Sequence, residues 1–457
     1  MIQYIGYRKI NAESKIAREA FEHDLSLSVI FIPESVKSIG ASAFHGCVNL
    51  TTVYPGQAYD LLMNEEYDNF PSVGIPEGVI EIGENAFSDC INLEEICIPD
   101  GVTEIKSFSF SRCVSLKKVD IPNSLTKICS HAFAGCSDLT EIHIPDSVTE
   151  LGDEAFSGCS SLRSVHFPKG LKKIGEGAFR GCTRLTQVEL PFGIAMVQGF
   201  SDCISLKKVI IPDSVIEIED QAFSGCSLLK KIRLPKSVTK IGRYAFDGCS
   251  NLTDIRIPGG VSEIEYSSFG RCSALTSIFL PDGVTRIDDY AFSGCTRLRE
   301  IIIPESVEEI GCSAFSDCIL LGEVHIPEGI TTIENSTFSN CKSLSRITIP
   351  DGVTEIGDHA FEDCWGLEYI YLPNSITEVG ENAFKNCIGL YDLTLSEGLS
   401  RIKPWTFAYC KNLSYIHIPD GMQAIDEYAF AYCSGLDKVY VKRKEIIDES
   451  AFVGCFE

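Results

Sequence analysis

Five side chains that can bind a metal ion recur at one position of successive 23-residue units: Cys97, Asp120, His143, His166 and Glu189. Thiolate, carboxylate and imidazole groups are all ligands of Zn²⁺. If the units stack as parallel strands about 4.8 Å apart, the five positions span about 19 Å, so only two or three of them could share one ion. His143 and His166 are therefore weak candidates for a metal site. A solvated surface is the competing interpretation, and we expect no metal and no cofactor.

The same position continues to the end of the chain and carries other side chains that could contact a partner. Aromatic residues concentrate in the last units, where the candidates for partner binding are Tyr369, Tyr371, Tyr391, Tyr415, His417 and Tyr440. Basic residues gather in the middle units, where the candidates are Lys208, Lys231, Arg233 and Arg256. Aromatic side chains dominate many recognition surfaces, and a basic group could dock a carboxylate-rich partner. A charge-balanced solvated surface is the alternative for the basic group.

Motifs of known catalytic chemistry are missing from the sequence. There is no HExxH, no GxxxxGK[ST] and no CxxC pair, and Gly175, Gly177 and Gly181 stand at positions that the repeat itself explains. The formal charge of -25, from 64 acidic and 39 basic side chains, disfavours nucleic acid and anionic lipid as partners. No apolar run is long enough to cross a membrane. We therefore expect no enzyme, no nucleic-acid partner and no membrane insertion.

These residues are positioned by a repeat with the pattern P-x-S/G-V-x-x-I-G-x-x-A-F-x-x-C-x-x-L-x-x-I-x-I. LxxIxI ends in alternating β-branched residues and predicts a short strand, which the following proline closes into a turn. VTEI is a second short extended piece. Phe and Cys lie three residues apart in AFxxC, which predicts one α or 3₁₀ turn with both side chains inward. The Gly, Asp or Asn before most cysteines tolerates a left-handed backbone.

Eighteen of the 21 cysteines share one phase of this repeat. Stacked units would place them in a ladder of small apolar side chains, so a buried structural role is favoured over disulfides or reactive thiols. Cys97, Cys129 and Cys312 lie outside the ladder and are expected to be more exposed. Since 23 residues cannot bury a core alone, the units must stack. The prediction is an α/β solenoid of about 19 coils, with one long parallel β-sheet and short helical turns on the other sides.

The repeated phrase resembles the BspA-like leucine-rich repeats of bacterial and mucosal-protozoan surface proteins. Units such as IPDGVTEIGDHAFEDCWGL, residues 349–367, match in period and in their Pro, Phe, Cys and Leu positions. The resemblance covers nearly the whole chain. It implies a leucine-rich-repeat solenoid and, for some members, adhesion to host proteins or to other microbes. It carries over no catalytic or binding residue.

We expect a single solenoid over residues 1–457, with an irregular first coil at 1–32 and an atypical last coil at 442–457. Residues 55–74 form an insertion that leaves at the end of a strand and returns in phase at Pro76. It is interpreted as a tolerated loop with a helical piece, although insertions at a solenoid edge can carry function. The unit at 191–203 lacks two residues, which predicts a kinked or tightened coil.

Taken together, the sequence predicts a monomeric, non-catalytic protein that binds a protein or glycan through its strand face, as a secreted or cell-surface adhesin. An intracellular interaction scaffold is the alternative, because no signal peptide is visible at the N-terminus. A metal-binding or thiol-reactive protein is the third interpretation.

Overall fold

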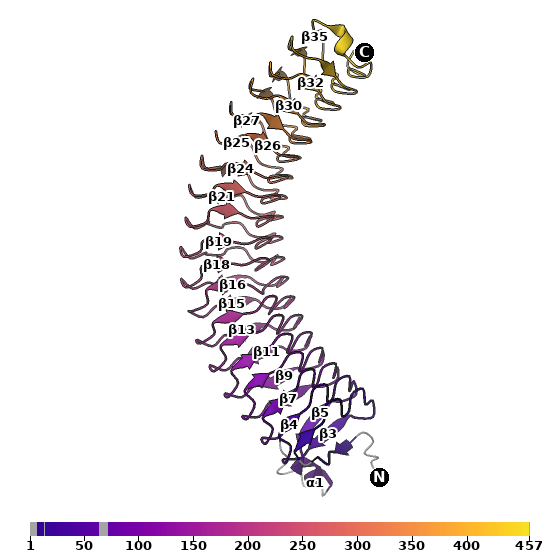
Figure 1. Ribbon diagram of the computed structural model, residues 1–457, viewed down its shortest axis with the longest axis vertical. Helices are drawn as coiled ribbons and strands as arrows, with labels where there is room; N and C mark the ends of the chain where they lie inside the picture. Colours follow the sequence, from indigo (N-terminus) through magenta and orange to yellow (C-terminus); the bar gives the residue numbers. More distant parts are fainter. Residues whose placement is uncertain (1–6, 13, 64–71, 457) are drawn as a thin grey trace. The chain divides into compact units, whose positions relative to one another are not determined.

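The structure is a computed structural model that describes residues 7–12, 14–63 and 72–456. Its chain forms two compact units, one up to Ile216 with Gln221–Leu228, and the other of Glu217–Asp220 with Leu229–Glu457. Each unit is a stretch of β-solenoid, and the chain makes about 18 turns against the predicted 19. Figure 1 shows the coils of each unit stacked in chain order.

The first strand of each coil comes from the LxxIxI segment, as predicted. In the first unit these strands are β1 (Tyr7–Lys9), β3 (Val29–Ile32), β5 (Thr52–Pro55), β7 (Glu95–Cys97), β9 (Lys118–Asp120), β11 (Glu141–His143), β13 (Ser164–His166), β15 (Gln187–Glu189) and β17 (Lys208–Ile210). In the second they are β21 (Ser277–Phe279), β23 (Glu300–Ile302), β25 (Glu323–His325), β27 (Arg346–Thr348), β29 (Tyr369–Tyr371), β31 (Asp392–Thr394), β33 (Tyr415–His417) and β35 (Lys438–Tyr440). Bridges at Lys231 and Asp254, and at Arg256 and Phe279, continue the row.

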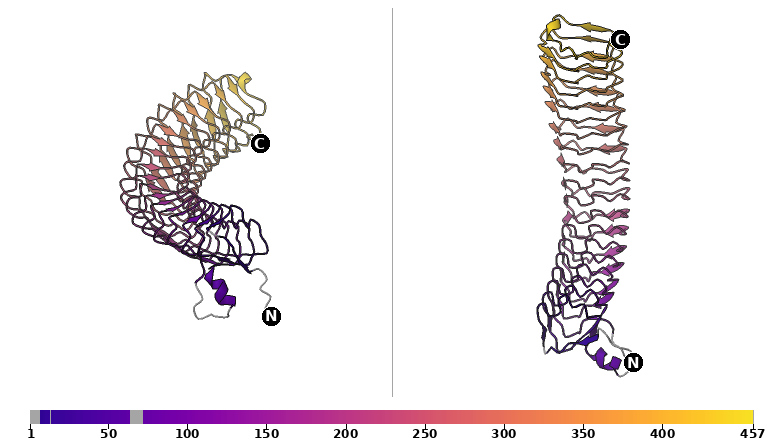
Figure 2. Two further views of the ribbon diagram at one scale, coloured as in Figure 1. Left: turned by 60° about the horizontal axis from the view of Figure 1, so that its bottom comes forward. Right: turned by 90° about the vertical axis from the view of Figure 1, so that its right-hand side faces the viewer.

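A second row of two-residue strands comes from the VTEI segment. Its members in the first unit are β2 (Lys15–Ile16), β4 (Ser38–Ile39), β6 (Glu81–Ile82), β8 (Glu104–Ile105), β10 (Lys127–Ile128), β12 (Glu150–Leu151), β14 (Lys173–Ile174) and β16 (Met196–Val197). In the second they are β18 (Glu217–Ile218), β19 (Lys240–Ile241), β20 (Glu263–Ile264), β22 (Arg286–Ile287), β24 (Glu309–Ile310), β26 (Thr332–Ile333), β28 (Glu355–Ile356), β30 (Glu378–Val379), β32 (Arg401–Ile402) and β34 (Ala424–Ile425). Figure 2 shows the strands of a unit stacked in parallel rows.

Strand pairing follows the repeat register. His143 lies opposite His166, one period away, in the parallel pair β11 and β13. The insertion lengthens the sequence separation between paired strands but keeps the same repeat positions opposite each other, since Ser38 of β4 lies opposite Glu81 of β6. At the short unit, β15 and β17 remain paired although the segment that joins them lacks two residues. The repeated phrase therefore fixes which residues become neighbours.

The predicted helical turn at AFxxC is wrong, and so is the α/β description that it supported. Within the described residues, helix is confined to α1 (Gln57–Met63) and the 3₁₀ turn η1 (Lys444–Ile446). In a representative coil, Glu154 and Gly158 have φ angles of 52° and 72°, which interrupt any right-handed helix. The N–H groups of Glu154, Phe156 and Gly158 each donate across 2.7 Å to carbonyls of the next coil. We call this side of the coil, centred on the phenylalanine, the turn side.

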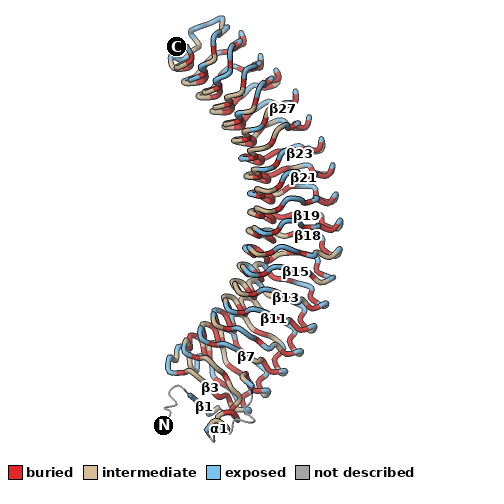
Figure 3. Tube along the Cα trace, turned by 180° about the vertical axis from the view of Figure 1, so that it is seen from behind, coloured by how far each residue is buried: buried red, intermediate tan, exposed pale blue. Residues whose placement is uncertain are grey.

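The core is a stack of identical side chains along the turn side. Phe133 and Phe156 are fully buried, and their rings stack 5.3 Å apart within 5° of parallel. Figure 3 shows the buried segments recurring at the same place in every coil. Each offset aromatic pair of this kind stabilises the fold by about 0.5–1.5 kcal/mol beyond the area it buries.

The cysteine ladder is confirmed as a buried structural feature, with eighteen buried thiols that form no disulfide. The ladder thiols also donate hydrogen bonds that the repeat pattern did not predict. Cys159 Sγ donates to the carbonyl of Phe133, one coil earlier, across 3.3 Å, and Cys136 N–H donates to the same oxygen across 3.2 Å. The pattern extends from Cys47 to Cys455. Cys97, Cys129 and Cys312, outside the ladder, are half-buried.

The described part of the insertion contacts the strand face of the first coils. Tyr59 of α1 packs edge-on against Phe31, with ring centroids 5.2 Å apart, and Lys9 reaches Asp60 across 2.8 Å. Phe31 occupies the position that is exposed in later coils, and here it is fully buried. Residues 64–71 of the insertion lie outside the described residues. The helical piece expected in the insertion is present as α1, which ends before these residues.

Candidate functional site

The strand face of the second unit carries five of the six predicted residues, in strands β29, β33 and β35, and Tyr391 directly precedes β31. Tyr371 lies opposite Thr394, and His417 lies opposite Tyr440, in parallel pairs. The neighbouring column places Tyr369 opposite Asp392. All six predicted aromatic and histidine residues are exposed: Tyr369, Tyr371, Tyr391, Tyr415, His417 and Tyr440.

Geometry along this surface, which we call the aromatic face, explains the exposure. In each three-residue strand only the middle side chain, such as Ile370 or Ile416, points into the core, and it is 2% or less exposed. The flanking side chains therefore point out. Tyr415 Oη donates to Asp392 Oδ1 of the preceding coil across 3.4 Å, which links two coils at the surface. From Tyr371 to Tyr440 is three strand spacings, or about 14 Å.

Tryptophan and other tyrosines of the same coils lie away from this face. Trp405 stacks on Tyr428 with centroids 4.5 Å apart, and Tyr409 stacks on Tyr432 at 4.9 Å. These contacts run along the turn side from coil to coil. Tyr409 and Tyr432 therefore pack against each other and do not belong to the aromatic face.

The predicted basic residues are exposed but fall in both units. Lys208 lies in β17 of the first unit, and Lys231, Arg233 and Arg256 lie in the second. Lys231 Nζ is 3.7 Å from Asp254 Oδ2, so part of its charge is balanced within the protein.

Two further apolar residues lie on the strand face and were not among the candidates predicted from the sequence. Phe279 lies opposite Ile302, and their side chains are 54% and 76% exposed. Each adds apolar surface to a column that is otherwise mostly polar. The available signal was the type of residue: an apolar letter at a position whose other members are polar or aromatic.

The predicted metal candidates His143 and His166 are exposed and face each other across β11 and β13. Over the described ranges, the only group of three or more side chains close enough to hold a metal is a different one, Glu22, His23 and His45. It lies on the turn side of the first two coils. The sequence pattern missed it because its members occupy two different phases of the repeat.

Thiol chemistry has little support in the half-buried cysteines. Burial raises the pKa of Cys97 and of Cys312, and burial together with the nearby Glu104 raises the pKa of Cys129 to about 12. A reactive thiol needs a lowered pKa. Cys97 is further covered by the chain returning from the insertion, since a Cβ at Gly74 would lie 2.6 Å from the Cys97 Cβ.

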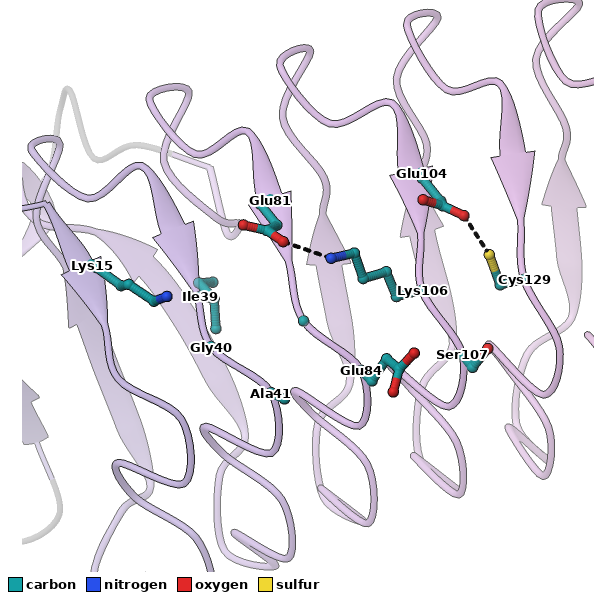
Figure 4. Close-up of a pocket in the computed structure, with 11 residues that line it drawn as sticks. Lys15, Ile39, Gly40, Ala41, Glu81, Glu84, Glu104, Lys106, Ser107 and Cys129 are labelled. Atoms are coloured by element: carbon teal, nitrogen blue, oxygen red, sulfur yellow. Dashed lines mark hydrogen bonds and ion pairs between the residues drawn. The ribbon is translucent and has the colours of Figure 1, made fainter.

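Figure 4 shows a polar groove of about 460 Å³ beside the second strands of the first unit. Three of its charged side chains, Glu81, Lys106 and Glu104, have partners within the protein. Lys106 Nζ is 2.5 Å from Glu81 Oε1, and Cys129 Sγ donates to Glu104 Oε1 across 2.8 Å. The hydrogen bond from Lys106 lowers the pKa of Glu81. Lys15 and Glu84 also line the groove.

A stacked solenoid with one exposed, variable strand face is the architecture of a leucine-rich-repeat binding protein. The BspA type leucine rich repeat region family matches the chain in six copies, at residues 14–60, 64–186, 105–228, 196–321, 263–391 and 354–457. The chain belongs to this family. Leucine-rich-repeat proteins are generally non-catalytic and commonly bind proteins.

A solved structure agrees with this assignment. A leucine-rich repeat protein from Bacteroides ovatus is 30% identical, with 91% of this chain and 92% of that chain covered and a TM-score of 0.56. A Treponema pallidum leucine-rich repeat protein is 31% identical, with 40% of this chain and 77% of that chain covered and a TM-score of 0.33. Comparison with curated protein sequences gives no significant match. No helix within the described ranges has the length and apolar character needed to span a bilayer.

Proposed function

We propose that this protein is a non-catalytic cell-surface adhesin that recognises a host or microbial protein or glycan through the aromatic face. The observation that carries the proposal is the set of tyrosines in one exposed patch, with Tyr371 54% and Tyr440 52% exposed. Large aromatic side chains held outward by a rigid sheet lose little conformational entropy on binding and supply both apolar area and a hydroxyl.

Basic residues support a role for the same unit in contacting acidic partners. Arg233 and Arg256 are exposed on the strand face, and Arg256 forms a backbone bridge with Phe279 of the next coil. Rim charges of this kind mainly raise the association rate of an oppositely charged partner. The first unit contributes Lys208 as a separate candidate.

The test is a binding screen of the purified full chain on arrays of host matrix proteins, mucins and glycans. A triple variant, Tyr369→Ala with Tyr371→Ala and Tyr415→Ala, removes the centre of the aromatic face. The matched control replaces three tyrosines of the same unit that contact one another elsewhere, Tyr244, Tyr266 and Tyr290. Circular dichroism verifies that both variants are folded.

Binding that only the face variant loses, by at least tenfold in Kd, supports the proposal, because hot-spot residues commonly cost 2 kcal/mol or more, or about thirtyfold. Equal binding by the wild type and the face variant contradicts the aromatic face as the site. If the wild type binds no extracellular ligand but captures a cytoplasmic protein, the scaffold alternative replaces the adhesin.

A further inference from the structure

Two histidines meet on the turn side of the first two coils. His23 N–H donates to the carbonyl of His45 across 2.7 Å, so the inter-coil hydrogen bonds hold the two residues side by side. Their rings lie 5.0 Å apart at 63° to each other. Glu22 precedes His23 directly, and both side chains are exposed. The backbone therefore presents three metal-ligating groups at one place.

The separation of these groups suits a small coordination sphere. One donor atom from each of Glu22, His23 and His45 lies within 4.8 Å of the other two. Tetrahedral zinc binds nitrogen and oxygen at about 2.0–2.2 Å, which requires donors roughly 3.4 Å apart. The donors must move closer by up to about 1.4 Å, which rotations of the exposed Glu22 and His23 side chains can supply without moving the backbone.

A buried nitrogen of His45 marks the site as more than a surface cluster. His45 Nδ1 is shielded from solvent and has no hydrogen-bond partner, and it lies 3.8 Å from Asp89 Oδ2. Asp89 is held in turn by Arg112 Nε across 3.2 Å and by Ser88 Oγ across 3.1 Å. If His45 Nδ1–H turned a few tenths of an ångström toward Asp89 and donated to it, the tautomer would be fixed and the other nitrogen left free to bind a metal, as is usual for zinc-binding histidines.

The space for the His23 ring exists because residue 46 is glycine. A Cβ at Gly46 would lie 2.1 Å from His23 Nδ1, and Gly46 has a φ of 68°. The next coil carries Asp89 at the equivalent position, also with a positive φ, of 60°. This backbone conformation therefore accepts a side chain, and the lack of a side chain at Gly46 is what leaves room for the His23 imidazole.

We propose that Glu22, His23 and His45 bind a divalent transition-metal ion of the zinc type, with Asp89 orienting His45. Two imidazoles and a carboxylate give three protein ligands and leave one coordination position open to water or to a partner. Imidazole ligands favour such ions over Mg²⁺ and Ca²⁺. The site lies entirely in the first unit and is independent of the aromatic face.

The experiment titrates Zn²⁺ into tag-free, chelator-treated full-length protein by calorimetry, with a phosphine reductant that keeps the thiols reduced. His23→Ala and His45→Ala are each expected to weaken Zn²⁺ binding at least tenfold, and Asp89→Asn about tenfold. His143→Ala is the matched control, since it removes an exposed histidine of the same unit, and it leaves the affinity within twofold. Glu22→Gln removes a ligand charge at an exposed position where folding is not at risk.

Absorption spectra of the Co²⁺-loaded protein report which atoms bind. Ligation by nitrogen and oxygen gives visible d–d bands without the intense near-ultraviolet band of a Co²⁺–thiolate bond. A thiolate band, affinities that stay unchanged in both His23→Ala and His45→Ala, or a wild-type Kd weaker than about 1 mM would each overturn the proposal.

Discussion

Removing one rung of the cysteine ladder tests how strongly this fold depends on protonated thiols. Burial raises the pKa of Cys159 to about 12. In the unfolded chain a cysteine has a pKa of about 8.5. The folded-state pKa is the higher one, so the contribution of the thiol to stability is complete below pH about 8.5 and is lost as the pH rises toward 12.

The size of this effect follows from linkage. At pH 9.5, one unit above the unfolded pKa, ionisation stabilises the unfolded state by about 1.4 kcal/mol per thiol, and at pH 7.5 by less than about 0.1 kcal/mol. Cys159→Ala deletes this term. At pH 7.5 the variant should be less stable by about 1–2 kcal/mol, because Phe133 loses one hydrogen bond and a small cavity forms. At pH 9.5 this difference in the free energy of unfolding between wild type and variant, here called the gap, should be smaller by about 1.4 kcal/mol.

Urea unfolding followed by circular dichroism, in reductant and at both pH values, measures the two gaps. The control is Ala155→Gly, which alters a buried residue of the same coil without touching a titrating group. Its destabilisation should be the same at both pH values. If the Cys159→Ala gap also stays constant within about 0.3 kcal/mol, the claim that Cys159 is buried and protonated in the folded state is refuted. With eighteen such rungs, the wild type should unfold steeply above pH about 9.

Three further outcomes follow from packing and charge. A thiol reagent at pH 8 should quickly modify at most three cysteines in the native protein, namely Cys97, Cys129 and Cys312, and all 21 after denaturation. A fourth rapidly modified cysteine would contradict the burial of the ladder thiols. Arg271→Ala should lower the free energy of unfolding by about 1–3 kcal/mol, because it leaves the Asp247 carboxylate, which is only 3% exposed, without its charged partner. The control Arg256→Ala should change the free energy of unfolding by less than about 0.5 kcal/mol. Tyr59→Ala should speed amide exchange around Phe31, because it removes the ring that covers the strand face there, and unchanged exchange would argue against that cover.

The strands, their register and the buried ladder could be predicted from the sequence because one residue type serves each structural position. The alternation in Glu-Ile-His at 141–143 determines which side chain is buried, and the period determines that His143 meets His166. The aromatic face was predicted in the same way, since Tyr371 and Tyr440 share a phase of the repeat.

The turn side could not be predicted from spacing alone. Phe156 and Cys159 lie three residues apart, which fits a helical turn as well as the observed turn with positive φ at Gly158. The choice depends on hydrogen-bond acceptors one coil away, such as the carbonyl of Ala178, which no local pattern encodes. The approach of His23 to His45 was missed for the same reason.

The inter-coil hydrogen bonds also bear on how such a chain can change length. Since each coil offers the same donors and acceptors to its neighbour, from the Phe carbonyl to the ladder thiol, gain or loss of one whole coil by recombination between repeats would leave no buried group unmatched. The short unit shows that even two missing residues are absorbed locally. Core positions keep the stack continuous while strand-face positions change freely, so gene duplication can lengthen the scaffold and diversify its surface in a single event.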